Sequence, residues 1–217
     1  MDIKVKETIE NLNKNGMETV YVEKTEDICS VIEKMIPKNS TVGVGGSVSL
    51  NECGALTLLR NGNYRFFDRY DPNLDAEGKN DALKKSLGAD FFLSSANAIT
   101  EKGEIYNVDG LGNRVAALNF GPKTVIFVVG KNKIVKDLKE ADIRVKTIAA
   151  PKNAVRLNKK TPCAKLGKCL AVANNTNCSF NDGCLSEDRI CRNYLILGKQ
   201  KNDGRIKVII CNEPLGY

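Results

Sequence analysis

Apolar and polar positions follow two different periods along the chain, and segments of the two kinds alternate. Apolar residues at helical spacing predict a helix over 3–15 and a second one that Thr25 caps and Pro37 ends. Further helices are predicted over 75–87, 137–147 and 151–157, and one follows the turn at 45–47. Short apolar runs predict buried strands over 19–22, 64–67, 90–93 and 124–129, and one that begins at Thr41.

This alternation of strands and helices indicates an α/β fold with a mostly parallel sheet flanked by helices. We expect one domain over residues 1–217, which includes a cysteine-rich insertion at 159–193 where the periodicity is lost. The strands expected over 194–200 and 205–211 flank an Asn-Asp-Gly turn, so a C-terminal β-hairpin is predicted.

The segment 94–130 carries many small, hydrogen-bonding side chains between two buried strands. A loop that only closes a sheet needs one or two turn residues, so this density indicates a binding site. The alternative is a long hairpin whose Asn, Asp and Gly residues serve its turns. The candidate residues are Ser94, Ser95, Asn97, Thr100, Asn107, Asp109, Gly110, Asn113, Arg114 and Lys123.

A glycine-rich turn after the strand at Thr41 is the second candidate for a site. Gly45, Gly46 and Ser47 join this strand to the next predicted helix, which places backbone N–H groups where an anion can bind. Ser49 and Glu52 add polar side chains nearby. The alternative is that the glycines only permit a tight turn and close packing.

The charge and composition restrict the chemistry. The chain of 217 residues has 33 Lys and Arg against 26 Asp and Glu, a net charge of +7, and no histidine. The missing histidine excludes Ser/His/Asp and Cys/His catalysis and every His-ligated metal site, so Glu52 and Asp109 are the acid–base candidates. The positive charge favours an anionic small molecule. It argues less for nucleic acid, because basic and acidic residues are interleaved and only 6% of residues are aromatic.

No signal peptide or apolar stretch long enough to span a membrane is visible, so we expect a cytoplasmic protein with reduced cysteines. Five of the eight cysteines fall in the segment 159–193. Cys163, Cys169, Cys184 and Cys191 could hold a zinc ion or an iron–sulfur cluster, with Cys178 between the two pairs. Their spacing is wider than in ordinary zinc or ferredoxin motifs. The alternatives are a labile redox disulfide and cysteines without a special role.

Several segments resemble the LUD-domain family of lactate-utilisation proteins. They are GVGGSVSLNECG (43–54), SANAITEKGEIYNVDGLGNRVAALNFGPKTVIFVVGKNKIV (95–135), AAPKNAVRL (149–157), TPCAKLGKC, CLSEDRIC and EPLGY. The resemblance implies a fold similar to the ribose-5-phosphate isomerase, glucosamine-6-phosphate deaminase and CoA-transferase group. In those proteins a glycine turn and loops at strand carboxyl ends form an anion-binding cleft. The segment 174–183 around Cys178 departs from the family pattern, which leaves the geometry of a four-cysteine site open.

The resemblance implies a role in the oxidation of lactate or a related organic acid, with an anionic metabolite or cofactor in the cleft. Some family members are associated with iron–sulfur subunits that oxidise L-lactate to pyruvate, so such a partner is expected, and a homo-oligomer is left open. Two alternatives stand beside it: a redox-sensing or electron-transfer accessory, and a stand-alone sugar-phosphate isomerase or CoA-transferase-like enzyme. The sequence leaves open whether the chain is itself an enzyme. We expect Ser47 and Asp109 to line one electropositive hollow.

Overall fold

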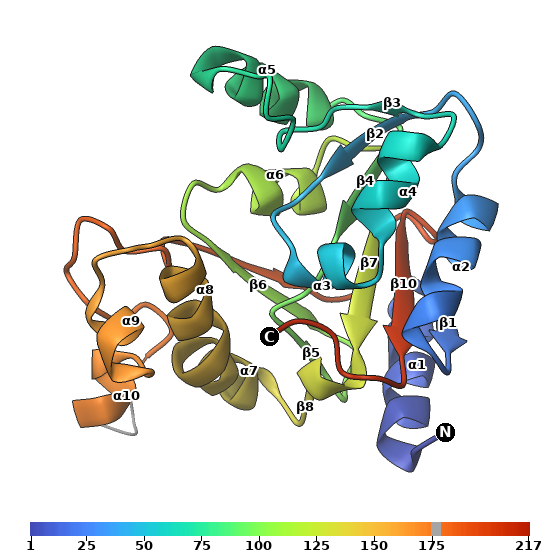
Figure 1. Cartoon of the computed structure of the whole chain (residues 1–217). Coiled ribbons are helices and arrows are strands. Elements are labelled where there is room, and N and C mark those ends of the chain that lie inside the picture. The colour runs from blue at the N-terminus through green and yellow to red at the C-terminus, as the bar shows by residue number, and fades with distance from the viewer. Residues whose placement is uncertain (175–178) are drawn as a thin grey trace.

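The structure is a computed structural model that describes residues 1–174 and 179–217. The centre of the molecule is a six-stranded parallel sheet (Figure 1). Its strands, in spatial order, are β1 (Glu18–Val22), β10 (Ile206–Cys211), β7 (Thr124–Gly130), β4 (Phe91–Ser94), β2 (Thr41–Val44) and β3 (Arg65–Phe66). Every neighbouring pair is parallel. The prediction of an α/β fold with a mostly parallel sheet is therefore confirmed.

The strand β7 shows why the central runs are apolar at every position. Val125, Phe127 and Val129 pack into one core cluster, whereas Ile126 and Val128 pack into another on the opposite face. The first face is covered by α1 (Ile3–Lys14), α5 (Ala76–Ser86) and α6 (Asn113–Asn119). The second is covered by α2 (Ile28–Met35), which η1 (Thr25–Asp27) precedes, and by α3 (Val48–Glu52) and α4 (Ala55–Asn61).

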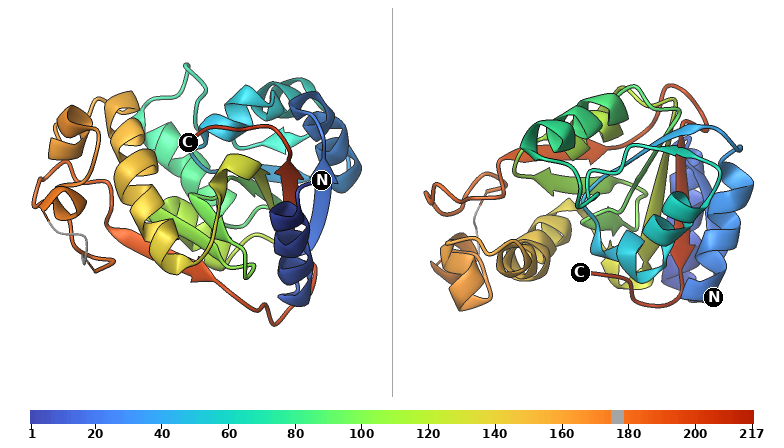
Figure 2. Two further views of the ribbon diagram at one scale, coloured as in Figure 1. Left: turned by 90° about the horizontal axis from the view of Figure 1, so that it is seen from below. Right: turned by 45° about the horizontal axis from the view of Figure 1, so that its top comes forward.

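A second, smaller sheet lies beside the first (Figure 2). Its strands, in spatial order, are β8 (Ile134–Val135), β5 (Ala98–Thr100), β6 (Ile105–Asp109) and β9 (Asn193–Leu197). β5 and β6 form an antiparallel pair, and the turn between them uses Gly103 at a φ of 78°, a left-handed conformation that favours glycine. β5, β6 and α6 occupy the segment between β4 and β7, for which the alternative to a binding site was a long hairpin. β4 and β7 pair in parallel, so they are not the two arms of a hairpin.

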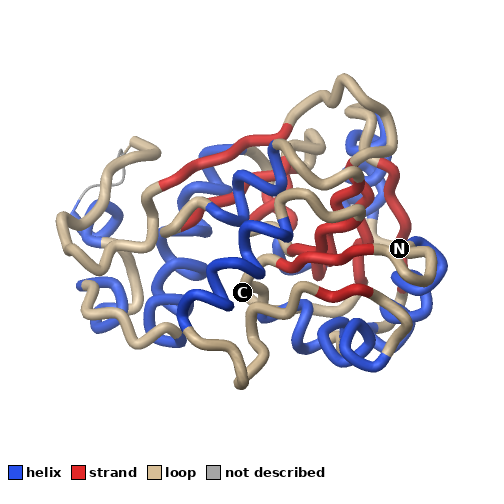
Figure 3. Tube along the Cα trace, turned by 90° about the horizontal axis from the view of Figure 1, so that it is seen from above, coloured by secondary structure: helices blue, strands red, loops and turns tan. Residues whose placement is uncertain are grey.

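The expected helices over 137–147 and 151–157 form one continuous helical run. It consists of α7 (Leu138–Arg144), the π-helical turn η3 (Val145–Ala149) and α8 (Ala150–Arg156). Pro151 lies in the first turn of α8, and proline has no N–H group to donate to the preceding turn, which accounts for the wider π-helical turn there. The C-terminal end of the chain lies beside this run (Figures 2 and 3).

The predicted C-terminal hairpin is wrong, although both of its strands exist. β9 pairs with β6 in the smaller sheet, whereas β10 lies between β1 and β7 in the larger one. Both edges of β10 are occupied by parallel neighbours, so no edge remains for β9. The residues between them pass over the end of α1, where the Gln200 and Gly204 N–H groups donate to the carbonyl oxygens of Asn15 and Gly16.

The cysteine-rich segment contains two short helices, α9 (Pro162–Leu166) and α10 (Leu170–Asn174), and otherwise irregular chain in the described residues. The short 3₁₀ helix η2 (Lys131–Lys133) completes the elements used below. Within the described part of the chain, no helix has the length and apolar character needed to cross a membrane.

Candidate functional site

The candidate site is a cleft of about 480 Å³ at the carboxyl ends of the central strands. Because β2, β4 and β7 are parallel neighbours, their carboxyl ends meet at one edge of the sheet. The turns that follow them supply Gly46, Ser47, Ser95 and Lys133, and α8 supplies much of the facing wall. The volume lies in the range typical of small-molecule sites.

Sequence-predicted ligand residues from two distant parts of the chain line this cleft. They are Gly46, Ser47, Ser95, Asn97, Asp109, Gly110, Asn113 and Arg114. The remaining predicted residues do not line it. They are Gly45, Ser49, Glu52, Ser94, Thr100, Asn107 and Lys123.

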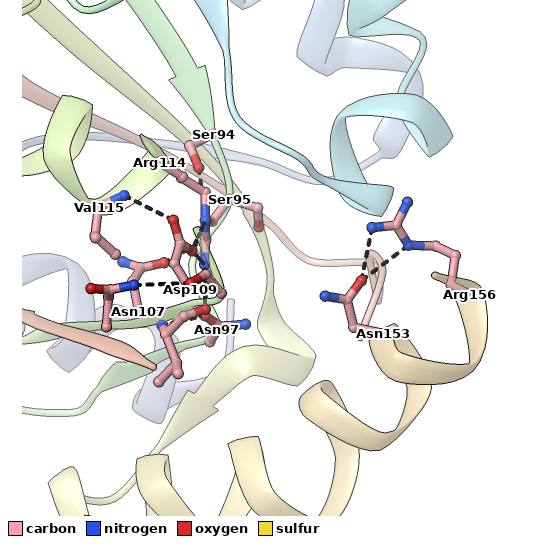
Figure 4. Close-up of polar contacts among 12 residues, drawn as sticks. Ser94, Ser95, Asn97, Asn107, Asp109, Arg114, Val115, Asn153 and Arg156 are labelled. Atoms are coloured by element: carbon pink, nitrogen blue, oxygen red, sulfur yellow. Dashed lines mark hydrogen bonds and ion pairs between the residues drawn. The ribbon is translucent and has the colours of Figure 1, made fainter. Parts of the chain in front are cut away.

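The Arg114 guanidinium is buried at the base of the cleft, and the protein itself uses all five of its N–H donors (Figure 4). Its Nε donates to Asp109 Oδ1 at 2.8 Å. Nη1 donates to the Ser95 carbonyl oxygen at 2.9 Å and to Asn107 Oδ1 at 2.7 Å. Nη2 donates to Asn97 Oδ1 at 2.9 Å and to the Val108 carbonyl oxygen at 3.0 Å. Arg114 therefore holds the loops in position rather than offering free donors to a ligand.

Asp109 is the anion that balances this buried charge. The second carboxylate oxygen of Asp109 accepts the Val115 N–H at 3.0 Å, near the start of α6. Both oxygens of Asp109 therefore accept hydrogen bonds from the protein, and only 9% of the residue is exposed. The geometry gives Asp109 a structural role beside Arg114, and the predicted acid–base role stays a prediction.

Gly45 and Gly46, which the sequence places together as ligand residues, differ in their surroundings. A Cβ atom at Gly45 would lie 2.8 Å from Arg114 Cδ and 3.0 Å from Ser94 Oγ. The same atom at Gly46 would meet only Tyr70 Oη, at 3.3 Å. The absence of a side chain at Gly45 thus leaves the space that the Arg114 side chain occupies, whereas Gly46 borders the open cleft.

Glu52 and Ser49 contact the C-terminal segment. The Gly216 N–H donates to Glu52 Oε2 at 2.5 Å, and Ser49 Oγ donates to the Leu215 carbonyl oxygen at 3.2 Å. This geometry gives Glu52 a role in holding the segment that carries Tyr217 to the cleft. The predicted catalytic role of Glu52 stays a prediction.

Lys123, Thr100 and Asn107 lie away from the cleft for different reasons. Lys123 precedes β7, so it lies at the opposite edge of the sheet, where it pairs with Asp90 at 2.7 Å. Hydrogen bonds from Lys123 and Thr41 hold the pKa of Asp90 well below its usual range. Thr100 is buried and donates to Glu104 Oε2, and Asn107 lies beneath Arg114.

Lys133 is a cleft residue that the sequence analysis missed. Only 3% of it is exposed, and its Nζ donates to Ser49 Oγ at 2.9 Å and to Ser95 Oγ at 3.1 Å. Burial, together with the charges of Arg144 and Arg114, lowers its pKa from 10.5 to about 7. The sequence signal was a lysine next to the apolar pair Ile134-Val135, directly after a buried strand.

Arg156 and Asn153 on α8 were also missed, although both fall in a segment that carries the family resemblance. Arg156 Nε donates to Asn153 Oδ1 at 3.1 Å and to Tyr217 Oη at 2.9 Å. Figure 4 shows this pair on α8, apart from the Arg114 cluster. Among the described residues no ion pair includes Arg156, so its charge is not balanced by a carboxylate there.

The side chains around the cleft are predominantly cationic. Seven Lys and Arg residues line it against three Asp and Glu residues. The cations are Arg69, Arg114, Lys133, Arg156, Lys159, Arg189 and Arg192, and the anions are Asp109, Glu187 and Asp188. A cleft with this excess of positive charge attracts anions.

The four predicted metal ligands line a second, small cavity of about 30 Å³, next to the cleft. Cys163, Cys169, Cys184 and Cys191 all border it. In the described chain, however, no three Cys, Asp or Glu side chains are arranged so that they could hold a metal ion. Burial and the nearby Cys163 raise the pKa of Cys191 to about 12. Cys178 lies outside the described residues.

Comparisons with known proteins agree with this architecture. A family model described as LUD domain matches residues 5–211. A DUF162 family protein from Deinococcus radiodurans is similar in structure over 96% of this chain and 96% of its own, with 17% sequence identity and a TM-score of 0.50. At this identity the likeness shows a shared fold. No curated protein matches the sequence.

Two further solved structures match less well. Ribose 5-phosphate isomerase A from Methanocaldococcus jannaschii matches 82% of this chain and 80% of its own, with 12% identity and a TM-score of 0.38. eIF2B beta from Chaetomium thermophilum matches 61% of this chain and 47% of its own, with 16% identity and a TM-score of 0.36. TM-scores this low carry no argument about function.

Proposed function

The chain belongs to the LUD-domain family, and from this membership we propose that its cleft binds a small organic anion in the oxidation of lactate or a related organic acid. Membership supports a function related to lactate utilisation in general. The observation that carries the specific proposal is the excess of seven cationic over three anionic residues around one cleft of about 480 Å³. A carboxylate or phosphate group in this cleft would be attracted by these charges and could accept hydrogen bonds from them.

The cations divide into structural ones and ones available to a ligand. All five N–H donors of Arg114 form hydrogen bonds within the protein, and Lys159 forms an ion pair with Asp188 at 3.4 Å. Arg69, Arg156 and Lys133 line the cleft without an ion-pair partner among the described residues, and the lowered pKa of Lys133 leaves a large share of it uncharged at neutral pH. Arg189 and Arg192 also lack an ion pair there, but their side chains donate to backbone carbonyl oxygens. We therefore assign the charge that recognises the anion to Arg156 and Arg69, in place of Arg114 and Lys123.

A titration of the full chain with lactate, pyruvate and inorganic phosphate, followed by calorimetry, tests the proposal. Arg156→Met should weaken the binding of the preferred anion about tenfold or more, because a charge-assisted hydrogen bond is lost. Lys123→Met removes the same charge at the opposite edge of the sheet and should leave the affinity unchanged. Equal losses in both variants, or no binding of any anion to the wild type, would contradict the proposal. Turnover of ribose 5-phosphate or an acyl-CoA would favour the isomerase or CoA-transferase alternative instead.

A second candidate function, that of a redox-sensing or electron-transfer accessory, is favoured by the four cysteines around one cavity. Anaerobic purification with elemental analysis and a visible spectrum tests it. Iron with a reversible absorption band would support electron transfer, and zinc would support a structural clamp. A metal-free protein whose thiol count stays constant under mild oxidation would contradict this candidate. The iron–sulfur partner subunit and the homo-oligomer stay predictions.

A further inference from the structure

Lys133 occupies a position where three strand ends of the larger sheet meet. It closes η2 directly after β7, while Ser49 follows β2 and Ser95 follows β4. The Nζ atom lies within hydrogen-bond distance of both serine hydroxyls, at 2.9 Å and 3.1 Å. Ser49 Oγ donates its own hydrogen to Leu215, so it faces Lys133 as an acceptor. The amine is thus held at a fixed place at the base of the cleft.

The charged groups around this amine oppose its protonation. Among the described residues no carboxylate forms an ion pair with Lys133. Arg144 on α7 and Arg114 on α6 bring positive charge, and Glu52 on α3 opposes them only in part. With its pKa lowered to about 7, a large share of Lys133 carries a free electron pair at neutral pH. A desolvated lysine next to other cations is the usual environment of a nucleophilic amine.

We propose that Lys133 is a nucleophile that forms an imine with the carbonyl carbon of a 2-oxo acid bound in the cleft. This inference rests on the proposed function, because the surrounding cations must hold the carboxylate of the same ligand. Only a carbonyl compound can form an imine, and this cleft attracts anions, so the ligand must be an anionic carbonyl compound. The proposed role in the oxidation of lactate or a related organic acid selects a 2-oxo acid among these, because oxidation of the lactate hydroxyl gives a 2-oxo acid.

The step balances without an oxidant or a reductant. The electron pair of Nζ forms a bond to the carbonyl carbon, and the electrons of the C=O double bond move to the oxygen, which takes up the proton that the nitrogen releases. Loss of water from this carbinolamine, which takes the hydroxyl group and the remaining hydrogen of the nitrogen, then breaks the C–O bond and leaves the imine. Ser95 and Ser49 accept hydrogens from Nζ and so orient its remaining electron pair.

Borohydride trapping on the full chain with pyruvate as the probe tests the inference. We expect peptide mass spectrometry to find the reduced adduct on Lys133 at a level roughly tenfold or more above that on Lys131, because an ordinary surface amine is almost fully protonated at neutral pH. Lys131, two residues away and exposed, is the matched control, so Lys131→Met should keep the adduct and Lys133→Arg should lose it. Lactate has no carbonyl carbon that can form an imine. It should leave no adduct and should slow trapping by pyruvate.

The possible failures are distinguishable. Calorimetry can show that pyruvate binds while borohydride leaves Lys133 unmodified or modifies Lys131 equally. That result would contradict the nucleophilic role of Lys133 and leave the anion-binding proposal in place. If neither pyruvate nor lactate binds, the proposed function itself fails. Should a Lys133 variant not fold, the peptide map of the wild-type chain still decides the question.

Discussion

Lys133 Nζ and Ser49 Oγ lie 2.9 Å apart although 84 positions separate them in the sequence. Their contact joins the turn after β7 to the helix after β2 across the edge of the parallel sheet. Both residues are buried, so this hydrogen bond forms where water does not compete with it. The uncharged hydroxyl satisfies the amine without supplying the negative charge that would keep it protonated.

The buried lysine should make the stability of the protein depend on pH. The pKa of Lys133 is about 7 in the folded chain, against 10.5 in an unfolded one. Between these values the unfolded chain binds the extra proton, so the free energy of unfolding rises with pH from about 7 to about 10.5. One proton contributes a slope of at most about 1.4 kcal/mol per pH unit. Denaturant unfolding of the wild type and of Lys133→Met across this range should show this contribution only in the wild type.

The control for that comparison is Lys131→Met, since Lys131 is exposed and its Nζ donates to Asn212 Oδ1 at the surface. Its unfolding free energy should follow the wild type at every pH. The groups whose charge acts on Lys133 are Arg144, Arg114 and Glu52, and all are kept in both variants. Parallel curves for the wild type and Lys133→Met would mean that the lysine has an ordinary pKa in the folded protein.

Arg114 should be essential for stability. Arg114→Met leaves the Asp109 carboxylate buried and without its cation, which costs about 3–5 kcal/mol of unfolding free energy. Arg114→Lys should restore only part of the loss, because an ammonium group cannot replace the five donors of a guanidinium. Arg192→Met removes an exposed arginine of the same cleft and should change stability by about 0.5 kcal/mol or less. Thermal or urea unfolding of the three variants measures the difference. Comparable losses for Arg114→Met and Arg192→Met would count against the structural role.

Two adjacent glycines should respond differently to the same substitution. Gly45→Ala places a Cβ 2.8 Å from Arg114 Cδ, and the Arg114 side chain cannot move because its donors are all bound. We expect a loss of about 1–3 kcal/mol in unfolding free energy. Gly46→Ala meets only Tyr70 Oη and should leave stability nearly unchanged. Equal unfolding midpoints for the two variants would show that the Arg114 side chain can keep its position when residue 45 has a Cβ atom.

Much of the fold could be predicted from the sequence, because buried parallel strands appear as short runs of apolar residues. The run at 124–129 is apolar at every position since both faces of β7 are covered, and this made the strand visible. The parallel arrangement in turn brings Ser47, after β2, and Ser95, after β4, to one cleft, which Asp109 reaches from β6 of the smaller sheet. Asn-Asp-Gly at 202–204 predicted a local hairpin instead, because turn chemistry does not report that β10 enters the sheet between two other strands.

The individual roles in the site could not be predicted, because they depend on contacts between distant residues. Gly45 and Arg114 look like ligand residues in the sequence, and only their mutual packing shows that they support each other. Lys133 lies in the stretch Lys131-Asn132-Lys133, which resembles an exposed polar turn. Its burial follows from Ser49 and Ser95, which β2 and β4 position, and from the C-terminal segment that covers it.

The cysteine-rich segment is attached to the second sheet by a buried polar network. Lys146 Nζ pairs with Asp142 Oδ2 at 2.8 Å, and Tyr106 Oη donates to Asp142 Oδ1 at 3.2 Å. Lys146 also donates to the carbonyl oxygen of Ser179, at 2.5 Å. Through this bond the network reaches the segment that carries the four cavity-lining cysteines.

Lys146→Met should therefore destabilise the protein and loosen this segment. Asp142 would stay buried without its cation, so we expect a loss of about 3–5 kcal/mol in unfolding free energy. The exposed Asp81–Lys85 pair has the same spacing of four residues, and Lys85→Met should cost no more than about 0.5 kcal/mol because water screens that pair. Loss of the bond to Ser179 should also speed the labelling of Cys163, Cys169, Cys184 and Cys191 by a thiol reagent under native conditions. Unchanged labelling rates in Lys146→Met, with the stability loss present, would show that the network supports the α7 helix alone and does not hold the cysteines.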